Sequence, residues 1–157
     1  IYEIVYDDTN KKDERWYINT NQSYAFANNK VTATYGTATA KAHADTLWTA
    51  QDETDGLGTE GEVATRGLKY NLIQTVKAQA AGLLAETDWY ITRKSEKNTA
   101  IPSAITTHRD AVRSKQAAME TAITNASDTP ALETLYTYTR QEDGSVTRPL
   151  GELPTLE

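Results

Sequence analysis

The sequence predicts an α+β fold, with a dominant antiparallel two-helix hairpin and a β-hairpin near each terminus. Apolar residues recur at three- and four-residue steps over residues 62–85 and again over 102–125, which is the spacing of one buried helix face. Runs rich in β-branched and aromatic residues at 1–6 and 15–20 indicate strands. An Asp-Gly dipeptide at 143–144 is typical of a hairpin turn.

Three regions follow along the chain. Residues 1–61 contain the N-terminal β-hairpin, a short helix and an acidic glycine-rich loop. Residues 62–126 form the helical hairpin, and residues 127–157 carry a short helix, the second β-hairpin and a C-terminal tail. We expect one cooperative body with accessory arms, because the chain is about one domain long.

In the N-terminal region, residues 1–6 (IYEIVY) and 15–20 (RWYINT) are expected to pair across a polar turn as the first hairpin. Residues 30–35 (KVTATY) predict a further short strand. Alanines together with Leu47 and Trp48 predict a helix over 39–51.

The two long helices each have a recognisable start. Thr59 and Glu62 have the spacing of a capping box, in which the two side chains satisfy backbone donors reciprocally, so the first helix is expected to begin at Glu62. Pro102 suits the first turn of the second helix, where a missing backbone donor costs nothing. These signals predict helices over residues 62–85 and 102–125.

The C-terminal region predicts a third, shorter helix. Asp128 or Thr129 can cap its start, and Pro130 fits the first turn. Beyond it, a two-residue turn at Asp143-Gly144 is expected to join two short strands, because this dipeptide accepts positive φ angles. The final segment, GELPTLE, is expected to be mobile or docked on a neighbour.

Composition excludes several classes of function. The chain has 157 residues, a formal net charge of −6 and an isoelectric point near 5.0. Its basic residues are scattered, so the positive surface that neutralises phosphates is missing and nucleic acid is not an expected partner. No stretch reaches the roughly 18 to 20 apolar residues of a membrane span. The absence of cysteine excludes disulfides and thiolate chemistry.

The acidic loop contains a glycine pattern that requires a test. Residues 56–61 read Gly-Leu-Gly-Thr-Glu-Gly, which fits the G-x-G-x-x-G pattern of dinucleotide-binding loops. That pattern should follow a buried strand, whereas here it follows Asp-Glu-Thr-Asp at 52–55, whose carboxylates repel a pyrophosphate. We therefore expect no nucleotide cofactor.

The same loop nearly matches a calcium-binding loop, and a calcium-dependent binding module is kept as an alternative function. Gln51, Glu53, Asp55, Gly56 and Glu62 occupy the positions of the first three ligands, the turning glycine and the bidentate glutamate. The neutral amide of Gln51 lowers the affinity for a hard cation. A solvated acidic loop with a capping box is the preferred interpretation.

Catalytic signatures are missing from the sequence, and we expect no enzymatic activity. Only His43 and His108 offer imidazole groups, and neither has a second ligand at the i, i+4 spacing of a metal signature. His108 lies on the apolar stripe of its helix, which is typical of a partly buried histidine. No cofactor and no metal are predicted.

Thr87-Asp88-Trp89 stands where the chain must turn after the first long helix. Thr and Asp can bond backbone donors in such a turn, and the Trp89 ring is expected to fold back onto Leu83 or Leu84, or onto the second helix.

The second helix offers a partner for this triplet. Arg109 and Arg113 lie four residues apart, and either guanidinium could reach the Asp88 carboxylate. The sequence thus predicts a corner clamp that holds the helical hairpin together.

These residues resemble the bacteriophage tail assembly chaperone family and related tail-fibre assembly proteins. In that family a helix ending in Leu-Leu leads to a Ser/Thr-Asp-Trp triplet, and a second helix carries a Tyr-Arg-x-x-Leu-Arg-like segment. The corresponding residues here, within 76–119, are Leu83-Leu84, Thr87-Asp88-Trp89 and His108-Arg109-Asp110-Ala111-Val112-Arg113. The chain differs at His108, where the family has tyrosine, and at Val112, where it has leucine.

The resemblance implies a non-enzymatic phage tail protein that works through protein–protein contacts. Its partners would be other tail, baseplate or fibre proteins, in a symmetric assembly with several copies of the chain. It would reside in the virion tail, and in the host cytoplasm during assembly. The alternative within the same family is a transient assembly chaperone that is absent from the virion.

Overall fold

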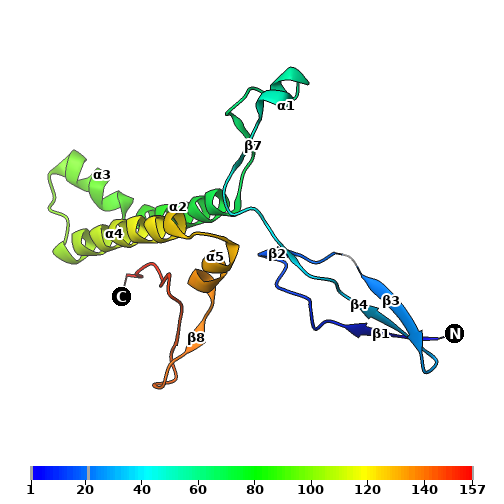
Figure 1. Ribbon diagram of the computed structural model, residues 1–157. Helices are drawn as coiled ribbons and strands as arrows, with labels where there is room; N and C mark the ends of the chain where they lie inside the picture. The colour runs from blue at the N-terminus through cyan, green and yellow to red at the C-terminus, as the bar shows by residue number, and fades with distance from the viewer. Residues whose placement is uncertain (1, 21, 157) are drawn as a thin grey trace.

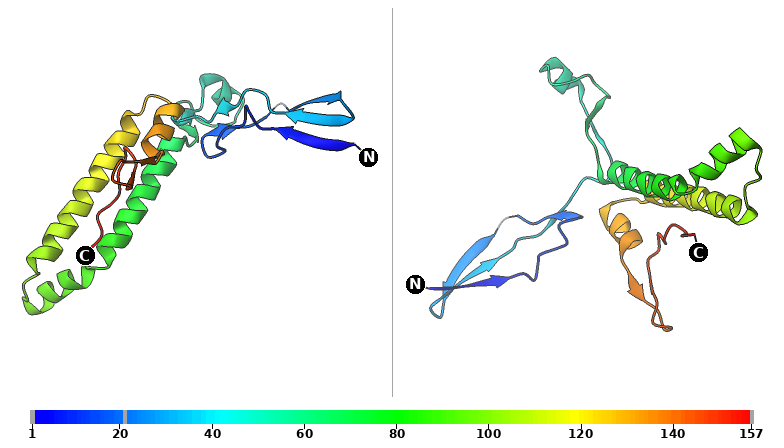
Figure 2. Two further views of the ribbon diagram at one scale, coloured as in Figure 1. Left: turned by 90° about the horizontal axis from the view of Figure 1, so that it is seen from below. Right: turned by 180° about the vertical axis from the view of Figure 1, so that it is seen from behind.

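The computed structural model describes residues 2–20 and 22–156. The predicted α+β fold is confirmed. Two long helices, α2 (Leu68–Ala85) and α4 (Ser103–Asn125), run side by side in opposite directions, as Figure 2 shows. The strands of the described residues are short and belong to four small sheets, of which three are simple two-stranded pairs.

The predicted second helix is confirmed, with Pro102 at its N-cap. The first helix begins six residues later than predicted, at Leu68, and Gly67 is its N-cap. The prediction of a start at Glu62 is wrong because residues just beyond it extend as strand β7 (Val63–Thr65).

Strand β7 pairs antiparallel with β6 (Thr46–Leu47). The capping box of this part of the chain lies instead at Thr49 and Asp52, where it opens the short helix α1 (Ala50–Thr54).

The N-terminal sheet has the strand order β1 (Glu3–Asp7), β4 (Lys30–Thr34), β3 (Ser23–Ala27). The predicted strand near 30–35 is therefore confirmed, but the predicted pairing of the first two strand segments is wrong. β1 pairs in parallel with β4, and the hairpin near the N-terminus is formed by β3 and β4.

A two-residue turn, Asn28-Asn29, makes that hairpin. Both residues have positive φ angles, of 50° and 65°, which asparagine tolerates better than most residues and which match the twist of a tight hairpin. The second predicted strand segment contributes β2 (Tyr17–Ile18), and its partner is β5 (Thr39–Ala40).

The helix predicted over residues 39–51 is wrong. That stretch contains β5 and β6, and only its last two residues enter α1. Backbone hydrogen bonds between the segment at Trp48 and the residues just before β7 outweigh the helix propensity of the alanines. The Trp48 amide donates to the Glu62 carbonyl at 2.9 Å, and the Trp48 carbonyl accepts from the Gly61 amide at 3.0 Å.

The C-terminal elements largely follow the sequence prediction. Helix α5 (Thr129–Tyr136) is capped by Asp128, whose carboxylate accepts the Ala131 amide at 2.8 Å. Strands β8 (Thr139–Arg140) and β9 (Val146–Thr147) form the expected hairpin. Its loop holds five residues rather than two, because only Gly144 adopts a positive φ angle.

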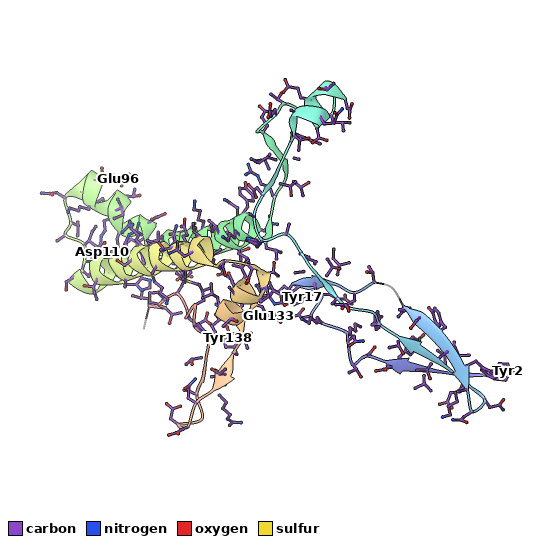
Figure 3. All side chains as sticks on the ribbon, viewed as in Figure 1. Tyr2, Tyr17, Glu96, Asp110, Glu133 and Tyr138 are labelled. Carbon is purple, nitrogen blue, oxygen red and sulfur yellow. The ribbon has the colours of Figure 1, made fainter. Side chains whose placement is uncertain are left out.

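The hydrophobic core lies where the helix pair meets α5, β2 and the C-terminal segment. It gathers residues from nearly the whole length of the chain: Trp16, Tyr17, Leu72, Val76, Met119, Ile123, Ala126, Leu132 and Leu150. The Tyr17 hydroxyl donates to the Glu133 carboxylate at 2.9 Å, and the two labelled side chains meet at this junction in Figure 3. That bond raises the pKa of Tyr17.

Three arms radiate from the same end of the helix pair (Figure 1). They are the N-terminal arm with the N-terminal sheet, the β6–β7 arm with α1 at its tip, and the C-terminal β8–β9 arm. Helix α3 (Asp88–Lys97) lies at the opposite end of the pair. Among the described residues, no helix combines the length and apolar character needed to cross a membrane.

Candidate functional site

The predicted clamp between the long helices is formed by Arg109 of α4, whose side chain is only 9% exposed. Its guanidinium donates to the Leu84 carbonyl at 2.7 Å and to the Thr87 hydroxyl at 2.6 Å, and it pairs with the Asp88 carboxylate at 2.9 Å. The cation thus meets the negative end of α2 and an acidic first turn of α3, both of which favour it.

Thr87 completes this arrangement. It is buried, and its hydroxyl donates to the Leu84 carbonyl at 3.0 Å while accepting from Arg109. Leu84 is half-buried beside it, and Leu83 lines a cavity of about 400 Å³ with Met119 and Leu153.

The predicted second cation of the clamp, Arg113, does not take part. Its guanidinium pairs with Asp110 of its own helix at 3.3 Å, and both side chains are more than half exposed. An α-helix advances about 5.4 Å per turn, so a residue one turn further along α4 lies that much farther from the corner. The structure therefore assigns the corner contact with Asp88 to Arg109 alone of the two arginines.

The predicted burial of Trp89 is wrong, because its side chain is 51% exposed. The prediction treated the triplet as a loop, whereas α3 begins at Asp88 and Trp89 lies in its first turn. Trp89 therefore contributes little to the corner and is available at the surface.

Trp89 belongs to a group on α3 that we call the α3 cluster, in which Trp89 is exposed and Tyr90 and Arg93 are half-buried. The two aromatic rings lie 3.8 Å apart, and the Arg93 guanidinium lies 4.8 Å from the Trp89 ring and 5.2 Å from the Tyr90 ring. The Arg93 Nε atom is buried without a hydrogen-bond partner among the described residues. Trp, Tyr and Arg are the residue types that most often anchor protein interfaces.

The acidic loop is organised around its own backbone. The Asp52 carboxylate caps α1, and the Thr49 hydroxyl and amide that bond it lower its pKa. The Glu53 carboxylate accepts the Glu60 amide at 3.0 Å, and the Gln51 amide donates to Asp55 at 2.9 Å.

This arrangement differs from a calcium loop, because the first part of the loop is helical and its carboxylates are bonded internally. Within residues 2–20 and 22–156, no group of three or more His, Asp or Glu side chains is placed to hold a metal ion.

The glycine pattern of the same loop has a packing role. A Cβ atom at Gly58 would overlap the Trp48 indole ring, so glycine lets the loop close over that ring. Gly56 and Gly61 have φ angles of 74° and 82°, which favour glycine at the two turns.

His108 is buried on α4, as the sequence predicts. It lines a shallow cavity with Ala104, Ala111 and Pro154, and among residues 2–20 and 22–156 no second histidine or carboxylate lines that cavity. Its position on the buried side of α4 is that of a packed side chain.

One surface that the sequence prediction missed lies on the N-terminal sheet. Alternate residues of β1, β3 and β4, with Tyr2, place large apolar side chains on one side. We call this surface the aromatic face, and it consists of Tyr2, Ile4, Tyr6, Tyr24, Phe26 and Val31. The period-two alternation of SYAFA beside Asn28-Asn29 is the signal that could have revealed it.

Comparison of the chain with protein-family models, with curated proteins and with solved structures finds no match.

Proposed function

We propose that the protein is a non-enzymatic structural component of a bacteriophage tail that works through protein–protein contacts at the baseplate, tail or fibre attachment. The assignment to a phage tail rests on the family resemblance over residues 76–119. Its partners are other tail, baseplate or fibre proteins, and the chain resides in the virion tail after assembly in the host cytoplasm.

The observation that carries the contact role is the exposure of large apolar side chains on elements that project from the helix pair. Tyr2, Tyr6, Tyr24 and Phe26 are between 59% and 66% exposed on one arm, and Trp89 is half exposed on α3. Contiguous apolar surface of this kind is uncommon on monomeric proteins and typical of interaction sites. Projecting arms also suit a lasting assembly, in which they reach neighbouring subunits (Figure 1).

The α3 cluster favours a second candidate, a transient chaperone of tail or tail-fibre assembly. It lies within the region that resembles the chaperone family, and its three residue types fit a compact binding site for one partner segment. A chaperone would leave before the virion is complete, so location distinguishes the two functions.

The deciding experiment is peptide mass spectrometry on gradient-banded virions, with the copy number of this chain measured against the major tail subunits. We expect stoichiometric recovery, in a fixed ratio to those subunits. Absence from banded virions together with presence in the infected-cell lysate would reject the structural role and establish the chaperone.

A matched pair of variants then tests the contact role. Trp89→Ala removes the centre of the α3 cluster, whereas Glu96→Ala changes an exposed residue near the end of the same helix (Figure 3). If the cluster binds a tail partner, incorporation into virions falls for Trp89→Ala and is unchanged for Glu96→Ala. Equal incorporation of both variants would remove the α3 cluster from the proposal.

A further inference from the structure

The N-terminal sheet has two chemically different faces. Tyr6, Ala33 and Tyr24 form one cross-strand row, and Ile4, Val31 and Phe26 form the next. Paired residues on neighbouring strands point to the same side, so both rows lie on the aromatic face. The Tyr2 ring extends this face, since its centroid lies 5.0 Å from that of Phe26.

The opposite face is polar and needs no cover. Its rows contain mainly threonine, serine, alanine and charged residues, and the Glu3 carboxylate pairs with the Lys30 ammonium at 2.8 Å. Alternation of this kind is the signature of a sheet with one face in water and one packed against an apolar layer.

That apolar layer is missing from the described chain. Tyr2, Ile4, Tyr6, Tyr24 and Phe26 are all between 56% and 66% exposed. The arm points away from the helix pair in each view, and none of the described helices lies over it (Figures 1 and 2). A small sheet requires packing of its hydrophobic face to be stable in water, so we expect the aromatic face to be covered in the assembled protein.

The area of this face fits pairing with a second copy. Four aromatic side chains of roughly 200 Å² each, about three-fifths exposed, together with Ile4 amount to on the order of 600 Å². Two such faces in contact bury about 1,200 Å² in total, which reaches the lower end of the range for specific, stable interfaces.

Charge and hydrogen bonding point the same way. The aromatic face carries no carboxylate, ammonium or guanidinium group, so two copies can meet without burying like charges, although each chain has a net charge of −6. The Tyr24 hydroxyl bonds to Gln22 at 3.0 Å, so this ring can be covered while its polar atom keeps a partner.

We propose that the aromatic faces of two copies of this chain pack against each other as a two-layer β-sandwich. The contact is isologous, with the middle strand β4 near the two-fold axis and the two sheets about 10 Å apart. This inference deepens the proposed function, on whose protein-contact role it rests, by naming a partner for one of the arms.

The first test is sedimentation velocity of the full chain across a dilution series. We expect a dimer at about 100 µM that dissociates on dilution, since an interface of this size allows micromolar affinity. Tyr24→Lys should weaken the dimer more than about tenfold, because it places an ammonium in the contact. Ala25→Lys, the next residue on the polar face, should leave the dissociation constant nearly unchanged.

A second measurement keeps the proposal testable if Tyr24→Lys unfolds the arm. The chain has no cysteine, so Val31→Cys and Thr32→Cys each introduce one thiol on opposite faces of β4. A bismaleimide with a spacer of about 10 Å should join two Val31→Cys chains and leave Thr32→Cys chains single.

A monomer at the highest concentration, or equal cross-linking of the two cysteine variants, would overturn the inference. Failure of the sheet pairing can be distinguished from failure of the proposed structural role in the tail. A monomeric chain recovered from virions refutes only the sheet pairing, whereas a cross-linked dimer that never enters virions refutes only the structural tail role.

Discussion

Arg109→Ala should destabilise the protein far more than Arg113→Ala, the substitution of the other arginine on α4. The guanidinium donates a buried hydrogen bond to Thr87 and a partly buried one to the Leu84 carbonyl, and a bond from a charged donor contributes roughly 1.5 to 3 kcal/mol. The ion pair with Asp88 adds less than about 1 kcal/mol, because that carboxylate is largely exposed and screened by solvent. Two such bonds and the weak ion pair together predict a loss of about 3 to 7 kcal/mol in the free energy of unfolding.

Urea unfolding followed by far-ultraviolet circular dichroism measures this loss. Arg113→Ala is the matched control, because it removes the same side chain one helical turn away from an exposed pair, and it should change the free energy of unfolding by less than about 0.5 kcal/mol. Arg109→Lys keeps the charge but not the planar fork, so its stability should lie between those of the wild type and Arg109→Ala. Similar stabilities for the Arg109→Ala and Arg113→Ala variants would refute the clamp.

Three further outcomes follow from the described contacts. Trp89→Ala should cost less than about 1 kcal/mol in the same urea titration, because the ring is half exposed, and a loss near 3 kcal/mol would mean that it is buried. Asp128→Ala removes the N-cap of α5 and should cost about 1 kcal/mol, whereas an unchanged unfolding midpoint would show that the bond to Ala131 contributes nothing. The hydrogen bond to Glu133 raises the pKa of Tyr17 in the folded state. The stabilisation from that bond is therefore present below about pH 10 and is lost as the pH rises through the folded-state pKa. Unfolding titrations from neutral to alkaline pH should show this loss in the wild type and not in Tyr17→Phe.

Helices α4 and α5 could be predicted because their signals are local. The apolar period of α4, the proline at its start and the cap of α5 each lie within a few residues of the boundary that they determine. The helix spacing also places Arg109 near the corner, but it does so equally for Arg113, and only the contacts in the structure separate the two.

The β half could not be predicted in the same way, because its pairings are distant in sequence. β1 pairs with β4 across more than twenty residues, and nothing within residues 1–6 indicates that the partner is not the next β-rich segment. Two-residue strands such as β5 and β6 are too short to show a period.

Trp89 shows a different limit. Whether Thr87-Asp88-Trp89 forms a loop or opens a new helix decides which side of the chain the indole ring occupies, and the triplet is compatible with both. A shift of one helical position turns a side chain by about 100°, which is enough to move an anchor residue from the core to the surface.

The meeting of Trp16, Leu72, Ile123 and Leu150 in one core has a consequence for synthesis. Helix α2 and helix α4 can form as soon as they leave the ribosome, but the core between them stays open until residue 150 has emerged. Contacts over such separations are slow to form, because the entropy of closing long loops is lost before the contacts compensate for it. The nascent chain therefore keeps part of its apolar core surface open until its C-terminal residues have emerged.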